Sequence, residues 1–174
     1  MLKPKLIPFD TSVTYKGLKS FDCNNEMINT FVSKSLKKRV KKHFSQAYVL
    51  LDEKEHFVGF YTLDTFSISR EIFELPDKPN GLPPMVPVVK LGMLGVDKRL
   101  QNKDIGKRLL KDALIKVANI SKIARCTGVY LLAEEEAISF YQKLGFVTLN
   151  KSKPIGMFLH IDKIFVGWDC YPTT

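Results

Sequence analysis

The chain has 174 residues, 45% of them hydrophobic and 26% charged, which is enough for one domain with a proper core and is typical of globular proteins. Its net charge of +9 indicates an anionic partner, such as nucleic acid or a phosphorylated cofactor, unless the basic surface serves only solubility. The apolar runs are too short to cross a bilayer, and the N-terminus has no apolar signal core, which predicts a cytoplasmic protein.

The first predicted elements are a weak strand within residues 5–15 and a helix whose start Asp22 or Asn24 can cap. Apolar residues recur at helical spacing from Met27 to Leu36. Five bases follow, and a continued helix would display them on an exposed face: Lys37, Lys38, Arg39, Lys41 and Lys42. This run exceeds what a solvated helix end needs for its dipole, which favours an anion-binding surface over that plainer interpretation.

Residues 46–69 are predicted to form two strands around the polar turn Asp52–Glu55, and five prolines make residues 74–87 an irregular excursion. The rest of the chain alternates strands with helices. The predicted elements are a buried strand at 88–96, a long amphipathic helix at 105–123, a strand at 129–133, a helix at 137–144 that Gly145 ends, and closing strands at 146–149 and 157–162. This order predicts a single mixed α/β domain over residues 1–174.

The sequence LQNKDIGKRLL, residues 100–110, places Gly106 at the start of the long helix. The first turn of a helix offers unpaired N–H groups and a partial positive charge, and Lys103, Lys107 and Arg108 add charge, so this loop is a candidate anion site. The other interpretation is that Gly106 only makes room for packing. A Walker loop is excluded because no hydroxyl follows Lys107, and three dispersed cysteines and three dispersed histidines predict no metal site.

Two motifs stand in order on consecutive elements of this region. Residues 101–106, QNKDIG, fit the pattern Arg/Gln-x-x-Gly-x-Gly/Ala at Gln101 and Gly106 but have Asp104 in place of its glycine, and residues 140–146 are FYQKLGF. Together they resemble the GCN5-related N-acetyltransferase (GNAT) superfamily. The resemblance implies an acetyl-CoA-dependent N-acetyltransferase of α/β fold. Its sheet would be mixed and mostly antiparallel, with a central split between two parallel strands and helices on either side.

A narrower resemblance covers nearly the whole chain. The segments FDCNNEMINTFVSKSLKKRVKKHF, GFYTL and KPIGMFLHI are similar to GNAT-type toxins of bacterial type II toxin–antitoxin systems, although Met93 stands where that subgroup often has arginine. This resemblance implies acetylation of the α-amine of aminoacyl-tRNA, a ribbon-helix-helix antitoxin as partner, and a homodimer. The basic run at 37–42 would then bind the tRNA. The alternatives are a GNAT enzyme that acts on a small amine, a peptide or a protein N-terminus, and a non-enzymatic RNA-binding module.

The resemblance also implies roles for individual residues. It places the diphosphate of CoA on the N–H groups of residues 102–107, the pantetheine arm along Met93–Val96 and the oxyanion near the backbone amide of Leu94. The implied cofactor-binding residues are Met93, Leu94, Val96, Gln101, Asn102, Lys103, Asp104, Ile105, Gly106 and Lys107. Tyr141 is the implied general acid, because a phenol is protonated at pH 7, whereas without the family it is interpreted as a core aromatic beside Phe140.

Several alternatives stay open on these residues. Asp104 would repel a diphosphate unless its carboxylate points to solvent or pairs with a neighbouring lysine. Gly92 and Gly95 allow either a ligand to approach the strand or the strand to pack closely against the protein. No general base stands out. An α-amine, with a reference pKa of about 7.7–8.0, is partly neutral at cytosolic pH and needs only water as base.

Overall fold

The computed structural model describes residues 4–73 and 80–167, so part of the proline-rich segment, 74–79, lies outside the described residues. The described strands form one seven-stranded sheet in the order β1-β2-β3-β4-β5-β7-β6. The strands are β1 (Lys5–Pro8), β2 (Gln46–Leu51), β3 (Phe57–Ser69), β4 (Met85–Val96), β5 (Gly128–Ala133), β6 (Val147–Thr148) and β7 (Ile155–His160). The helices are α1 (Glu26–Lys34), α2 (Leu36–Lys41), α3 (Ile105–Ile123), α4 (Glu135–Lys143) and α5 (Ile161–Gly167), with short 3-10 helices η1 (Arg70–Ile72) and η2 (Lys98–Leu100).

The sheet is mixed. β1 pairs antiparallel with β2, β2 with β3, and β7 with both β5 and β6, whereas β4 and β5 run parallel. The parallel ladder consists of Val89 opposite Val129 and Lys90 opposite Tyr130, although β4 continues to Val96. The mostly antiparallel sheet with one parallel pair and flanking helices confirms the predicted fold class.

The chain divides into two compact units. The first unit comprises Met1–Asp64 and Gly92–Asp112, and the second comprises Thr65–Leu91 and Ala113–Thr174. The chain therefore passes from one unit to the other within β3, β4 and α3. None of the helices in the described ranges combines the length and the hydropathy that crossing a bilayer requires, and the same ranges contain no cluster of three or more potential metal ligands.

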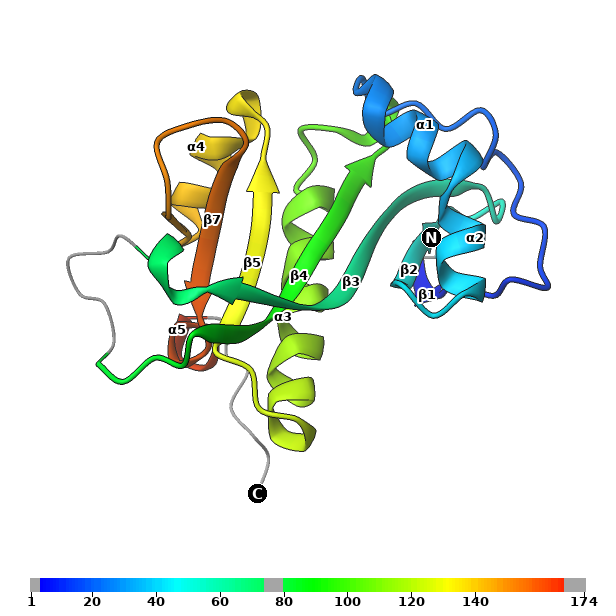
Figure 1. Cartoon of the computed structure of the whole chain (residues 1–174). Coiled ribbons are helices and arrows are strands. Elements are labelled where there is room, and N and C mark those ends of the chain that lie inside the picture. Colours follow the sequence, from blue (N-terminus) through cyan, green and yellow to red (C-terminus); the bar gives the residue numbers. More distant parts are fainter. Residues whose placement is uncertain (1–3, 74–79, 168–174) are drawn as a thin grey trace. The chain divides into compact units, whose positions relative to one another are not determined.

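In the first unit, α1 and α2 share a hydrophobic core with β2 and β3. Figure 1 shows α2, in light blue, beside β1 and β2, and α1, in blue, leading into it. The Asn25 side chain caps α1 by accepting a hydrogen bond from the Ile28 N–H at 3.1 Å, so the cap is Asn25 and not the predicted Asp22 or Asn24. The single predicted helix ends at Ser35 and resumes as α2. The buried core of this unit includes Val32, Leu36, Ala47, Val49, Phe57 and Phe60.

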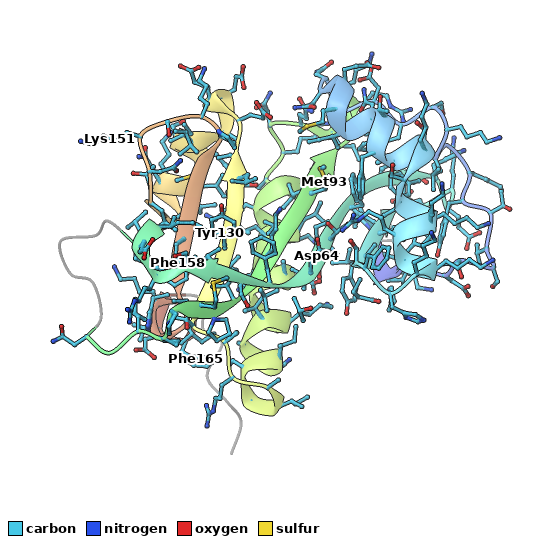
Figure 2. All side chains as sticks on the ribbon, in the orientation of Figure 1. Asp64, Met93, Tyr130, Lys151, Phe158 and Phe165 are labelled. Atoms are coloured by element: carbon cyan, nitrogen blue, oxygen red, sulfur yellow. The ribbon has the colours of Figure 1, made fainter. Side chains whose placement is uncertain are left out.

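In the second unit, β5 and β7 form an antiparallel ladder, and Figure 1 shows them side by side in yellow and orange. Gly128 is required at the start of β5, because a Cβ there would lie 2.1 Å from the carbonyl oxygen of Leu159. α4 contacts β5, and α5 contacts both strands. A separate apolar cluster, which Figure 2 marks at Tyr130 and Phe158, consists of Ile68, Phe73, Val86, Val88, Tyr130, Leu149 and Phe158.

Several predicted boundaries are wrong by one to three residues, and two of them have a clear physical reason. β4 begins at Met85, inside the segment predicted to be irregular, and it accommodates Pro87 because proline is tolerated near the start of a strand. The final strand ends at His160 rather than at Asp162, because the His160 ring accepts a hydrogen bond from the Asp162 N–H at 3.2 Å as the chain turns into α5. The apolar pattern of the sequence did not predict α5.

Candidate functional site

The loop before α3, in the first unit, leaves its backbone donors free. α3 has no acidic residue in its first turn. Among the described residues, no acceptor takes a hydrogen bond from the N–H groups of residues 102–107, and the first satisfied donor is the N–H of Arg108, which bonds the carbonyl oxygen of Asp104 at 3.0 Å. Free donors at the positive end of a helix form a binding site for an anion such as a diphosphate. The predicted anion site therefore fits this loop.

Two residues of this loop adopt the left-handed backbone conformation. Asn102 and Asp104 both have φ of 58°, which asparagine and aspartate tolerate better than other side chains but less well than glycine. The Asp104 carboxylate is exposed, and it forms no ion pair with Lys103, Lys107 or any other described residue. It therefore relies on solvent alone to weaken its repulsion of a bound anion.

The segment just before the free donors is anchored to the loop that leads into α1. The side-chain amide of Gln101 donates hydrogen bonds to the carbonyl oxygens of Cys23, at 2.9 Å, and Val96, at 3.0 Å. The Lys98 ammonium lies 2.8 Å from the Asp22 carboxylate. That Gln101 binds the cofactor stays a prediction, and in this structure its side-chain amide bonds the protein and positions the loop.

Charged hydrogen bonds strengthen this anchor. The buried Asp97 carboxylate accepts bonds from the Arg99 guanidinium at 2.8 and 2.9 Å, and these bonds lower the pKa of Asp97. The Lys98 ammonium and the N–H groups of Asn24 and Asn29 lower the pKa of Asp22 to about 2. Sequence reasoning missed this role of Asp22, because its partner lies 76 residues away.

The two glycines of β4 serve packing within the first unit. A Cβ on Gly92 would lie 2.7 Å from the hydroxyl oxygen of Thr62, and a Cβ on Gly95 would lie 3.1 Å from side-chain atoms of Ile28 and Phe60. The Thr62 hydroxyl also accepts a hydrogen bond from the Met93 N–H at 3.0 Å. Of the two interpretations of these glycines, close packing is the one that the structure supports.

The five predicted tRNA-binding bases divide into two groups. Four lysines are exposed, and we call them the α2 lysines: Lys37, Lys38, Lys41 and Lys42. Arg39 differs, because its Nε donates to the Ser45 hydroxyl at 2.9 Å and its Nη2 lies 3.5 Å from the Asp64 carboxylate, which Figure 2 labels. Arg39 thus holds α2 against the protein, while the α2 lysines remain a basic surface.

In the second unit, the candidate acid Tyr141 lies on α4 and is 9% exposed. Its ring packs edge-on against Phe140 and Phe146, with centroids 5.1 and 5.4 Å apart, and burial raises the pKa of Tyr141 to about 12. Within the described ranges the hydroxyl has no hydrogen-bond partner. The hydroxyl is also not fully enclosed. Among the described residues only one side-chain oxygen, Oδ1 of Asp64, is both fully enclosed and without a hydrogen-bond partner, so the unpartnered Tyr141 hydroxyl keeps some contact with solvent. Tyr141 is therefore a core aromatic that also keeps an available proton.

Comparison with known proteins gives consistent matches. A family model described as an acetyltransferase (GNAT) domain matches residues 44–148. A crystal structure of a bacterial toxin shares 31% identity over 99% of both chains, with a TM-score of 0.90. AtaT complexed with acetyl-methionyl-tRNAfMet shares 25% identity over 94% of this chain and 98% of that chain, with a TM-score of 0.84. A tyrosine-to-phenylalanine mutant of AtaT, bound to acetyl-CoA and to the C-terminus of the antitoxin AtaR, shares 26% identity over 92% of this chain and 95% of that chain, with a TM-score of 0.78.

Proposed function

The chain belongs to the acetyltransferase (GNAT) family, and on this premise we propose that it acetylates the α-amine of aminoacyl-tRNA. It is an N-acetyltransferase whose acetyl donor is acetyl-CoA. The observation that carries the proposed acceptor is the similarity, over 94% of the chain, to a toxin solved with acetyl-methionyl-tRNAfMet. Acetylation of the α-amine would block translation and make this chain a toxin.

The loop before α3 supports the proposed binding of the donor. The free N–H groups of residues 102–107 would hold the diphosphate, with Lys103 and Lys107 adding positive charge. Gln101 would act by anchoring this loop through Cys23 and Val96. The segment Met93–Val96 would guide the pantetheine arm, and the backbone amide of Leu94 would stabilise the oxyanion. When bound, acetyl-CoA supplies an acetyl thioester that an amine can attack.

Tyr141 would protonate the sulfur as the carbon–sulfur bond breaks. Its raised pKa keeps the phenol protonated at every physiological pH, and its hydroxyl has no competing partner among the described residues. The amine forms the new carbon–nitrogen bond and releases its proton to water. Roughly a tenth of an α-amine is neutral at pH 7, so the enzyme needs no strong base of its own for this acceptor.

The α2 lysines would bind the phosphates of the tRNA, and Arg39 would hold their helix in place through Ser45 and Asp64. We propose a ribbon-helix-helix antitoxin as partner and a homodimer in the cytoplasm, with the two units acting as one acetyltransferase domain. A toxin of similar fold bound to the C-terminus of its antitoxin supports the antitoxin proposal.

The experiment is a transfer assay with the purified full chain. Radiolabelled acetyl-CoA is incubated with aminoacylated tRNA, with the same tRNA after deacylation, and with the free amino acids. The proposal expects label in the RNA fraction only when the tRNA is aminoacylated, and mild base should release the label as an acetyl-amino acid. Label that enters small amines or peptides but not aminoacyl-tRNA would replace this function with the alternative acceptor class.

A further inference from the structure

The second unit carries an exposed aromatic side chain beside a cation. Phe66 on β3 is 42% exposed, and its ring lies parallel to that of Tyr130 on β5, at an interplanar angle of 1° and a centroid distance of 5.9 Å. The ammonium of Lys90 on β4 lies over the Phe66 ring, 5.0 Å from its centroid. We call these three residues the Phe66 platform.

One member of the Phe66 platform, Tyr130, is part of the hydrophobic core of the second unit. Tyr130 is 8% exposed and belongs to the buried cluster that also contains Val88 and Phe158. Tyr130 thus gives Phe66 a fixed partner, while Phe66 itself remains exposed. A phenylalanine held this way offers a flat apolar surface that core packing leaves uncovered.

Two further observations indicate a ligand with polar groups. Lys90 opposite Tyr130 is the last residue pair of the parallel ladder, so the platform stands where β4 and β5 cease to pair. The Tyr130 hydroxyl has no hydrogen-bond partner in the part of the chain that the structure describes, and it lies beside Gly156 of β7. An exposed apolar ring with a cation beside it matches a nucleotide, which combines a planar base with a phosphate.

We propose that the Phe66 platform binds the 3′-terminal nucleotide of the acceptor RNA, with the base stacked on Phe66 in place of the Lys90 ammonium, which moves from the ring to pair with the adjoining phosphate. This inference rests on the proposed function and names the subsite that would recognise its acceptor. The cation and the net charge of +9 favour an anionic planar ligand over a neutral aromatic side chain of a peptide. Recognition of a terminal nucleotide by stacking needs no base-specific contacts.

The test compares two acceptors that differ only in the nucleoside: an amino acid esterified to the 3′-hydroxyl of adenosine, and the methyl ester of the same amino acid. In the wild type, kcat/KM should be higher for the adenosine ester. Phe66→Ala should lower kcat/KM for the adenosine ester by about five- to a hundredfold and leave the methyl ester unchanged, because stacking on an aromatic side chain contributes about 1–3 kcal/mol per base. Phe66→Trp should restore most of the loss, which a merely structural role would not allow.

A second arm adds a 5′-phosphate to the adenosine ester. The phosphate should raise kcat/KM in the wild type by about two- to fivefold, and Lys90→Gln should remove that gain alone. Met85→Ala removes another exposed apolar side chain from β4 and serves as the control that should change neither acceptor. Thermal unfolding of each variant verifies that it is folded.

The outcomes separate the two proposals. If the wild type acetylates aminoacyl-tRNA but Phe66→Ala treats both esters as the wild type does, the platform is not the nucleotide subsite and the proposed function stands. A loss of equal size with the methyl ester would assign Phe66 to the amino acid and would also overturn the inference. If the wild type acetylates neither aminoacyl-tRNA nor the adenosine ester, the proposed function itself fails.

Discussion

Asp104 is the residue at which this chain departs from its family's loop pattern, and replacing it by glycine should tighten acetyl-CoA binding. The carboxylate is exposed and forms no ion pair with a described residue, so it faces a bound diphosphate uncompensated. Interactions between exposed charges are worth about 0.2–1 kcal/mol, which predicts a Kd lower by about 1.4- to fivefold for Asp104→Gly. Glycine also relieves the side-chain cost at φ of 58°, but it gains freedom in the unfolded chain, so stability should change little.

Calorimetric titration with acetyl-CoA at low and high salt measures this effect, and Asp104→Asn separates its two causes. Asparagine removes the charge and still tolerates the left-handed conformation. If repulsion dominates, both variants tighten binding equally and the gain shrinks as salt rises. If only the glycine variant tightens binding, the side chain at position 104 hinders the ligand through its size and not through its charge. An unchanged Kd in both variants would show that the diphosphate does not lie near this loop and would refute the reasoning about the free amides.

Four further predictions test other parts of the site. Tyr141→Phe should lower kcat by about 10²–10⁴-fold with an unchanged Kd for acetyl-CoA, and wild-type turnover would remove the residue from catalysis. Because the pKa of Tyr141 is raised to about 12, its proton is not lost below pH 9, so the wild-type rate should rise with pH up to the pKa of the acceptor amine, and a fall between pH 7 and 9 would contradict this. Replacing the four α2 lysines by glutamine should lower the slope of log KM for tRNA against log salt concentration by about 2.8–3.6, whereas Lys122→Gln on α3 should leave this slope unaltered. Gly92→Ala should cost about 1–3 kcal/mol in urea unfolding because its Cβ meets the Thr62 hydroxyl, while Gly167→Ala, with open space around it, should cost far less.

The long helix α3 could be predicted from its apolar periodicity alone, whereas other elements could not. The helix predicted at 105–123 coincides with α3 (Ile105–Ile123), because apolar residues that the fold buries, such as Leu110, Leu114 and Val117, recur along it at helical spacing. The break at Ser35 could not be predicted, since apolar spacing continues through it to Leu36. α5 could not be predicted because its short apolar sequence directly follows β7 and continues the apolar pattern of that strand. The boundary between them is set by a hydrogen bond from the Asp162 N–H to the His160 ring.

The candidate site was predictable in its motif but not in its supports. The free amides before α3 follow from the loop sequence alone, because any helix leaves its first donors unpaired. The anchor between Lys98 and Asp22 depends on a contact across 76 residues, which no local pattern encodes. The packing role of Gly92 likewise depends on Thr62, a residue of another strand. Sequence spacing indicates which backbone groups are free, whereas tertiary contacts determine which side chains are already used.

The loop before α3 has two parts that meet at Gln101: in the first the side chains are bonded to the protein, and in the second the backbone donors are free. Up to Gln101, polar side chains are bonded to the protein: Asp97 to Arg99, Lys98 to Asp22, and the Gln101 amide to two carbonyl oxygens. Beyond Gln101, the backbone donors and the side chains of Asn102, Lys103 and Asp104 have no protein partner among the described residues. The bonded half fixes the position of the free half. Because an anion site is effective only when its donors are held in place before the ligand arrives, we expect Gln101, the first residue of the motif, to contribute to the proposed diphosphate site by anchoring the loop.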